Sequence, residues 1–276
     1  MFRFRYAQTK RNGLSIASPP LWHLPSGFSV QHLADTGLLM MDNFCTRDEA
    51  KKIIDVYRDQ VKRSTVIHEN NESVVHSYRT SSDIFIPLKD IFVPPEKSNH
   101  SILKELVYRS SSLLGLPLDY VEQVSVSRYR TGEYYKSHYD HDGSIKADRL
   151  YTVLVYLNDM ADGEGGGTIF PDLNVIAQPV CGRAVCWVNS DLDKSVRRET
   201  RHAALPVLKD GAEKWILQLW LRGYKCSKVL KPMMYEGMPA GVPLQGDESL
   251  PAGFVASVDT DEKALFPADD TDAGSC

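Results

Sequence analysis

The sequence lacks three features that would each point to a class of protein. Its five cysteines are scattered and form no CxxC pair, so neither a structural zinc site nor a paired disulfide framework is indicated. No apolar run is long enough to form a signal peptide or to span a bilayer. The net charge of -4 gives no general attraction to nucleic acid or to an anionic membrane. We therefore expect a cytoplasmic protein without nucleic-acid or membrane partners.

The length of 276 residues and the hydrophobic content of 42% are enough for one large domain with extensions. Residues 1–40 contain the stretch ASPPLWHLPSG and no sustained periodicity, which predicts an N-terminal arm. Residues 226–276 are acidic and rich in Pro, Gly, Ala and Asp, which predicts a partly disordered C-terminal extension with a few docked residues. The folded domain is therefore expected over residues 41–225.

Two predicted helices precede a region of predicted strands. Thr46 and Glu49 form a capping box ahead of an apolar stripe, and a second stripe from Ile102 to Leu114 ends at Gly115. From about residue 120, turn residues separate short runs rich in Val, Tyr, Thr and Ile, such as VEQVSVSRYR, RLYTVLVYLN and KWILQLWLRGY. The pattern predicts an α+β fold that is mainly β, a sandwich or barrel with the N-terminal helices packed on one sheet.

The segment HYDHD at residues 138–142 is the first candidate for a metal site. Side chains two apart on a strand share a face, so His138 and Asp140 can bind one ion while Tyr139 and His141 point away. One imidazole, one carboxylate and a second, distant imidazole make the facial triad of non-heme Fe(II) oxygenases. A short HxD pattern is also common in solvated turns, so the pair alone leaves that alternative open.

The third ligand would come from the other histidines, which are His23, His32, His68, His76, His100, His141 and His202. Only His202 lies well downstream in a predicted β region, where a barrel can return it to the strand of His138. Further along, Lys214 opens the apolar run KWILQLWLRGY. A lysine pointing inward there would need an anionic partner, because burying an unpaired ammonium is costly. A lysine pointing outward would be an ordinary solvated residue.

Four motifs in order give these separate signals a common explanation. They are RTSSDIFI, YRTGEYYKSHYDHD, GGGTIFP and RHAALPVLKDGAEKWILQLW. Together they closely resemble the prolyl 4-hydroxylase type of Fe(II)- and 2-oxoglutarate-dependent oxygenase over roughly residues 40–224. The resemblance implies a double-stranded β-helix, the jelly-roll fold of cupin-like proteins, and an oxygenase domain within residues 41–225.

The resemblance also implies roles for individual residues. His138, Asp140 and His202 match the iron ligands, and Lys214 and Tyr129 match residues that bind the distal carboxylate of 2-oxoglutarate. Further candidates are Thr152, Thr168 and Tyr156 for the cosubstrate pocket, and Arg79, Ser81 and Trp187 for substrate contacts. The cofactors implied are Fe(II), 2-oxoglutarate and O2, with ascorbate as reductant.

The reaction implied is hydroxylation or oxidative dealkylation of an aliphatic C–H bond, with release of succinate and CO2. Because no separate peptide-binding domain is evident, we favour a small-molecule substrate such as an amino acid or biosynthetic intermediate. A peptidyl-prolyl 4-hydroxylase acting on a protein or peptide is the alternative. A non-catalytic jelly-roll protein that binds a metal or ligand is a further alternative, against which the complete triad and Lys214 argue.

Overall fold

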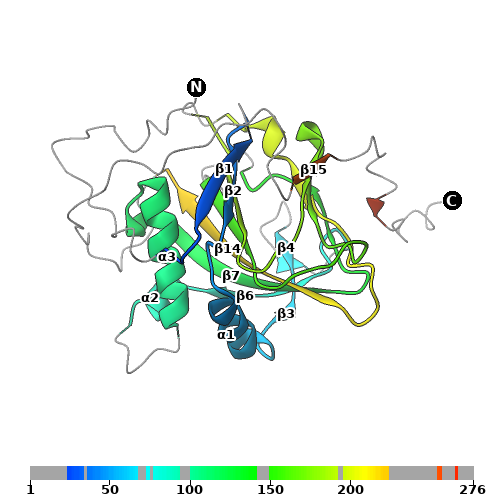
Figure 1. The fold of residues 1–276 in the computed structure, drawn as a ribbon, viewed down its shortest axis with the longest axis horizontal. Helices are drawn as coiled ribbons and strands as arrows, with labels where there is room; N and C mark the ends of the chain where they lie inside the picture. The colour runs from blue at the N-terminus through cyan, green and yellow to red at the C-terminus, as the bar shows by residue number, and fades with distance from the viewer. Residues whose placement is uncertain are drawn as a thin grey trace.

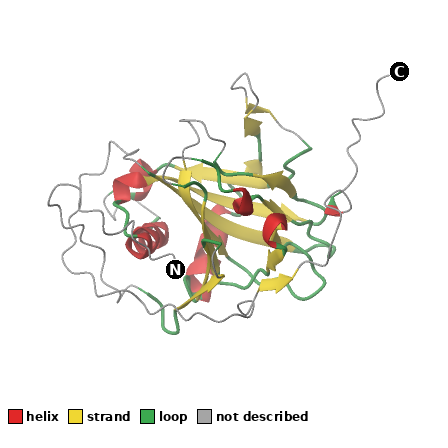
Figure 2. Cartoon of the chain, turned by 90° about the horizontal axis from the view of Figure 1, so that it is seen from above, coloured by secondary structure: helices red, strands yellow, loops and turns green. Residues whose placement is uncertain are grey.

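The computed structural model describes residues 24–33, 36–67, 73–74, 77–93, 100–141, 149–191, 195–223, 254–256 and 265–266. Its strands form the centre of the molecule, as Figure 2 shows. Most of them belong to two antiparallel sheets (Figure 1). A separate pair, β4 (Val66–Ile67) and β5 (Ser73–Val74), lies outside these sheets.

The larger sheet has eight strands in the order β1-β2-β12-β9-β14-β7-β6-β3. In chain order the strands are β1 (Ser29–Leu33), β2 (Leu38–Asp42), β3 (Lys62–Arg63), β6 (Ser82–Ile86), β7 (Val121–Arg130), β9 (Arg149–Tyr156), β12 (Ala184–Val188) and β14 (Glu213–Arg222). The central strands β9 and β14 are nearly continuous runs of buried residues, and β7 is buried over its middle residues. Such runs are expected of strands that are covered on both faces.

The smaller sheet has five strands in the order β15-β11-β10-β13-β8. They are β8 (Tyr135–His138), β10 (Thr168–Phe170), β11 (Val175–Ala177), β13 (His202–Ala204) and β15 (Phe254–Ala256). Two 3-10 turns, η5 (Pro171–Leu173) and η6 (Arg198–Thr200), lie beside these strands in the chain. The two sheets together make the predicted double-stranded β-helix.

Helices α1 (Arg47–Tyr57), α2 (Leu88–Ile91) and α3 (Ser101–Leu114) cover one face of the larger sheet, and η4 (Leu118–Tyr120) leads into β7 (Figure 1). The predicted capping box is present at α1, where Thr46 and Glu49 each accept a hydrogen bond from the other's backbone N–H. Helix α3 ends at Gly115, which takes the left-handed conformation that favours glycine. No helix within the described residues is both long and apolar enough to cross a membrane.

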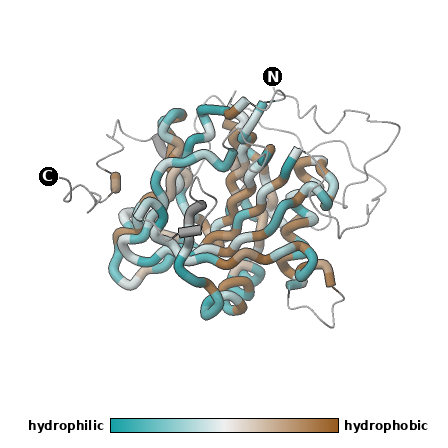
Figure 3. The backbone as a smooth tube through the Cα atoms, turned by 180° about the vertical axis from the view of Figure 1, so that it is seen from behind, coloured by the Kyte–Doolittle hydropathy of each residue, from teal (hydrophilic) through white to brown (hydrophobic). Residues whose placement is uncertain are grey.

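Two hydrophobic cores lie on the two faces of the larger sheet. Along β9, Val153 and Val155 belong to the core under the helices, while Leu154 and Tyr156 belong to the core between the sheets. This alternation follows from the period of two in a strand. Apolar residues accordingly recur along the central strands in Figure 3. The helix-side core thus anchors the larger sheet, and the inter-sheet core surrounds the space where a ligand site can form.

The predicted N-terminal arm is wrong for part of its range. Strands β1 and β2 fall within or across residues 1–40, and β2 lies inside the larger sheet between β1 and β12. The run LLMM in β2 is buried on both faces, so it lacks the alternation of polar and apolar residues that marks a half-exposed strand. Residues 1–23 lie outside the described residues.

Part of the C-terminal extension contacts the domain. Strand β15 pairs with β11 at one edge of the smaller sheet. Farther along, the ring of Phe266 lies 5.4 Å from that of Tyr134, measured between centroids. The rest of residues 226–276 lie outside the described residues.

Candidate metal and cosubstrate site

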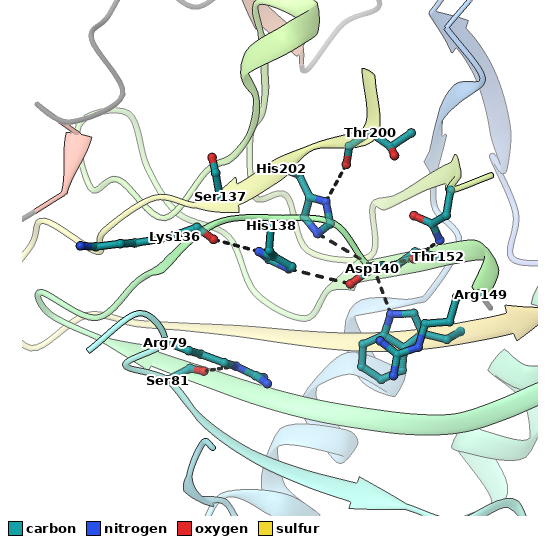
Figure 4. Close-up of polar contacts among 12 residues, drawn as sticks. Arg79, Ser81, Lys136, Ser137, His138, Asp140, Arg149, Thr152, Thr200 and His202 are labelled. Atoms are coloured by element: carbon teal, nitrogen blue, oxygen red, sulfur yellow. Dashed lines mark hydrogen bonds and ion pairs between the residues drawn. The ribbon is translucent and has the colours of Figure 1, made fainter. Parts of the chain in front are cut away.

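Three side chains from neighbouring segments converge in the smaller sheet. His138 on β8 and His202 on β13 are Cα partners across the two strands. Asp140 does not lie on the strand as predicted, because β8 ends at His138 and Asp140 sits in the bend that follows. The ligand atoms of the three residues all lie within 4.8 Å of one another. Figure 4 shows the side chains of His138 and His202 turned toward Asp140. The two histidines and the carboxylate can therefore hold one metal ion.

Hydrogen bonds to the backbone determine which nitrogen of each imidazole is free. His138 Nδ1 lies 2.9 Å from the carbonyl oxygen of Lys136, and His202 Nδ1 lies 2.8 Å from that of Thr200. A carbonyl oxygen can only accept, so each Nδ1 carries the proton and donates it. Each Nε2 is then left with a lone pair directed toward Asp140, at distances of 3.8 and 3.9 Å from its carboxylate oxygens. In this tautomer Nε2 of each ring is free to bind a metal.

Burial and charge keep His138 and Asp140 in their metal-binding protonation states. Burial, followed by the influence of His202, lowers the pKa of His138 well below its ordinary value. Burial alone would raise the pKa of Asp140, but the adjacent histidines, Arg149 and a hydrogen bond from Thr152 lower it. The site thus presents a neutral imidazole beside an ionised carboxylate. Within the described part of the chain, buried His202 Nε2 has no hydrogen-bond partner, which fits an atom that coordinates a metal.

Asp140 is held by two donors from the larger sheet. Thr152 on β9 and Trp220 on β14 donate hydrogen bonds of 2.6 and 3.1 Å to the same oxygen, Oδ2. Asn189, just after β12, donates in turn to the Thr152 hydroxyl at 2.9 Å. Sequence reasoning placed Thr152 only as a pocket candidate and missed Trp220 and Asn189 as partners of the carboxylate.

Aromatic rings pack on both histidines. Tyr135 stacks on His138 with the ring centroids 3.6 Å apart. Trp187, predicted as a substrate contact, is fully buried, with its ring 4.6 Å from that of His202 and in edge contact with Phe170. In this structure Trp187 therefore covers a candidate metal ligand and shields it from solvent.

Lys214 points inward, as the first of the two sequence interpretations proposed. Its side chain is fully buried, and its ammonium lies 4.7 Å from the ring centroid of Tyr129. No hydrogen bond reaches Lys214 Nζ from any residue that the structure describes. Burial lowers the pKa of Lys214 to about 7. A buried, unpaired ammonium calls for an anion, and a carboxylate of 2-oxoglutarate fits that need.

The other predicted pocket residues lie between the sheets around Lys214. Tyr129 is the Cα partner of Lys214 on the neighbouring strand. The hydroxyl of Tyr156 lies 2.8 Å from Thr168 Oγ1 and 3.0 Å from the carbonyl oxygen of Ala177, so Tyr156 and Thr168 join β9 to the smaller sheet. These side chains are buried and line the inter-sheet core on both sides.

Arg79 and Ser81, the predicted substrate contacts, are both buried beside the site. Arg79 pairs with Asp83 at 2.6 Å and donates to Ser81 Oγ at 3.1 Å. Its guanidinium also lies 4.9 Å from the ring centroid of Tyr135, the ring that stacks on His138. Arg79 is thus connected to the metal-binding residues through one aromatic ring.

Comparison with known proteins agrees with this site. Residues 124–222 match the 2OG-Fe(II) oxygenase superfamily. Prolyl 4-hydroxylase subunit alpha-2 of Gallus gallus is 29% identical over 181 residues, which are 63% of this chain and 32% of that protein. Prolyl 4-hydroxylase 13 of Arabidopsis thaliana is 25% identical over 227 residues, 72% of this chain and 78% of that protein. The chain thus spans about a third of the length of the Gallus gallus relative.

A solved structure shares the fold. It is the 2OG complex of the viral collagen prolyl hydroxylase vCPH from Paramecium Bursaria Chlorella virus-1, with 26% identity and a TM-score of 0.53, covering 69% of this chain and 98% of that one. Because the relatives and this structure are prolyl hydroxylases by name, the preference for a small-molecule substrate over a peptide was wrong. That preference rested on the lack of a recognisable peptide-binding domain. The four motifs, the His–Asp–His geometry and these matches identify a 2OG-Fe(II) oxygenase domain in this chain, and the domain is similar to that of prolyl 4-hydroxylases.

Proposed function

We propose that this enzyme hydroxylates a prolyl residue within a peptide or protein. The reaction would consume 2-oxoglutarate and O2, with ascorbate as the reductant that keeps the iron in the Fe(II) state. The observation that carries the proposal is the buried ammonium of Lys214, which has no hydrogen-bond partner among the described residues and packs, as His202 does, against side chains of the inter-sheet core. A non-catalytic metal-binding protein would have no need for that ammonium. The names of the relatives support a prolyl substrate.

In this proposal His138, Asp140 and His202 bind the iron, with Nε2 of each imidazole and one carboxylate oxygen as donors. Iron together with 2-oxoglutarate and O2 would supply the oxidative decarboxylation that yields succinate, CO2 and an oxidant able to attack a C–H bond. Lys214 and the Tyr129 hydroxyl would hold the distal carboxylate of the cosubstrate by charge-assisted hydrogen bonds. Tyr156 and Thr168 would close the wall of that pocket.

The substrate would approach from the side of His138. The His138 side chain is 13% exposed, whereas the side chains of Asp140 and His202 are 5% and 3% exposed. Trp187 covers His202 and excludes water from that side. Arg79 lies near the more open side, over the ring of Tyr135, where it would help to orient the peptide, and buried Ser81 would hold the Arg79 side chain in place.

Succinate release tests the proposal directly. The protein would be incubated with Fe(II), ascorbate and 2-oxoglutarate, with either a proline-rich collagen-like peptide or free proline. We expect the peptide to stimulate succinate release and to gain one oxygen atom on a prolyl residue, located by tandem mass spectrometry. Stimulation by free proline alone would contradict a peptide substrate. Metal binding without any succinate release would favour the non-catalytic alternative.

A further inference from the structure

We propose that Asn189 and Thr152 form a positioning relay that fixes which carboxylate oxygen of Asp140 faces the iron. The inference rests on the proposed iron site and adds two residues that would not touch the metal. Asp140 differs from the two histidines because it lies beyond the end of β8, in a bend. The ladder of the smaller sheet therefore does not fix its side chain, and the orientation must come from other contacts.

The direction of each hydrogen bond in the relay follows from the chemistry of its members. A metal-binding carboxylate can only accept, so at 2.6 Å the single proton of the Thr152 hydroxyl belongs to Asp140 Oδ2. Thr152 Oγ1 can then only accept from Asn189, which must present its Nδ2 amide hydrogens at 2.9 Å. The opposite amide orientation would place an acceptor against Thr152 and would compete for that proton. Asn189 thus directs the Thr152 proton toward the carboxylate.

The relay is rigid because the fold anchors each member. Thr152 is fully buried in the middle of β9, and Asn189 is only 1% exposed. The backbone of Asn189 donates to the carbonyl of Leu150 at 2.9 Å and accepts from the N–H of Arg197 at 3.0 Å. The larger sheet thus holds the relay in place, while the smaller sheet carries the two histidines.

The relay and Trp220 act on the same carboxylate oxygen. Thr152 and Trp220 are Cα partners on adjacent strands, and both donate to Asp140 Oδ2. Oδ1, the oxygen 3.8 Å from His138 Nε2, is left for the metal. Such outer partners of metal ligands are worth about 10- to 100-fold in metal affinity or activity. We therefore expect the relay to set the affinity of the triad for its metal.

The test measures binding of Mn(II) in the absence of 2-oxoglutarate, by calorimetry on the full chain. Thr152→Val keeps the shape of the side chain and removes the hydroxyl, so Mn(II) should bind about 10- to 100-fold more weakly. Thr152→Ser retains the hydroxyl and should bind within about threefold of wild type, a change far smaller than the loss of an outer partner. Asn189→Asp replaces the donor amide by an acceptor and should weaken binding as Thr152→Val does.

Two readouts separate this role from a general effect on packing. The visible spectrum of bound Co(II), which reports ligand geometry, should change in Thr152→Val and return to the wild-type form in Thr152→Ser. Asn189→Ala, which removes the donor without adding a buried charge, provides the same test if Asn189→Asp does not fold. Wild-type Mn(II) affinity in both Thr152→Val and Asn189→Ala would overturn the relay and leave the proposed function intact. Failure of the wild-type protein to bind Mn(II) would overturn both.

Discussion

The two faces of the larger sheet bury different kinds of side chain. On β14, Leu217, Leu219 and Leu221 face the helices and pack into a hydrophobic core. On the alternate positions, Lys214 and Trp220 face the smaller sheet and the metal-binding residues. One strand thus contributes stability on one face and chemistry on the other. The period of two in the strand keeps the two tasks apart, so each can be changed by mutation without the other.

The two sides of the larger sheet also differ in whether their buried charged side chains have partners. On the helix side, Arg109 donates to the carbonyl oxygen of Phe44 and to both carboxylate oxygens of Glu49, at 2.6 to 3.1 Å. Between the sheets, Lys214 is fully buried without a hydrogen-bond partner in the described part of the chain. Paired buried charge is structural, whereas unpaired buried charge marks a place for a ligand.

The largest expected effect comes from removing a metal ligand on the inter-sheet side. His202→Ala should weaken Mn(II) binding by more than about 100-fold, because a direct ligand contributes more than an outer partner does. Calorimetry measures the affinity, and circular dichroism checks that the variant is folded. A His202→Ala protein that bound Mn(II) as wild type does would remove His202 from the site.

Leu219→Ala makes a matched change on the helix-side face of the same strand. Leu219 is fully buried in the hydrophobic core, so its truncation should lower the free energy of unfolding by about 2–5 kcal/mol. Mn(II) affinity of the folded protein should stay at the wild-type value. Denaturant unfolding measures the free energy of unfolding, and calorimetry measures the Mn(II) affinity. A large loss of metal affinity would mean that the two faces are coupled.

Lys214→Met should stabilise the protein without cosubstrate, because it removes an unpaired buried ammonium. The gain at pH 7 is expected to be on the order of 2 kcal/mol. The exposed Lys209, which pairs with Glu164, provides the control: Lys209→Met should change stability little. Thermal and denaturant unfolding measure both variants. Destabilisation by Lys214→Met would show that the ammonium already has a stabilising partner.

The gain from Lys214→Met should also depend on pH. Burial lowers the pKa of Lys214 from 10.5 in the unfolded chain to about 7 in the folded one. Below pH 7 Lys214 is charged in both the folded and the unfolded state, so the folded wild-type protein bears the full cost of burying the ammonium. Between about pH 7 and 10.5 the unfolded state binds more protons, so the stability contributed by this group rises with pH. The difference between the variant and wild type should therefore shrink across that window.

Thr46→Ala should have the smallest effect of the series. It removes the side-chain cap of α1, far from the inter-sheet space, and should cost about 1 kcal/mol of stability. Metal affinity should not change. A Thr46→Ala variant with altered Mn(II) binding would show that the position of α1 reaches the site through the helix-side core.

Much of the fold could be predicted because its signals are local. The capping box at Thr46, the end of α3 at Gly115 and the strands from β7 to β14 depend on residues close together in the chain. Strand β2 was missed because LLMM is buried on both faces and shows no period. Such a strand is recognised only when its neighbours in the sheet are known.

In the candidate site, too, the residues that belong to local motifs could be predicted, and those that depend on distant strands could not. The spacing of His138 and Asp140, together with the motifs around them, was enough to predict a triad with His202 and an inward Lys214. The partners of Asp140 were missed because they depend on register between distant strands: Trp220 lies 80 positions from Asp140 in the chain. Asn189 acts only through Thr152, so no local pattern connects it to the metal.

The most direct test of the central claim is the affinity of the Mn(II)-loaded protein for 2-oxoglutarate, measured by calorimetry without O2. We expect the wild-type protein to bind 2-oxoglutarate and Lys214→Met to bind it about 10- to 100-fold more weakly, which is the effect of losing one charge-assisted hydrogen bond. Leu219→Ala, on the other face, should bind as wild type does. Equal 2-oxoglutarate affinity in wild type and Lys214→Met would contradict the claim that the unpaired ammonium between the sheets is the anchor for the cosubstrate.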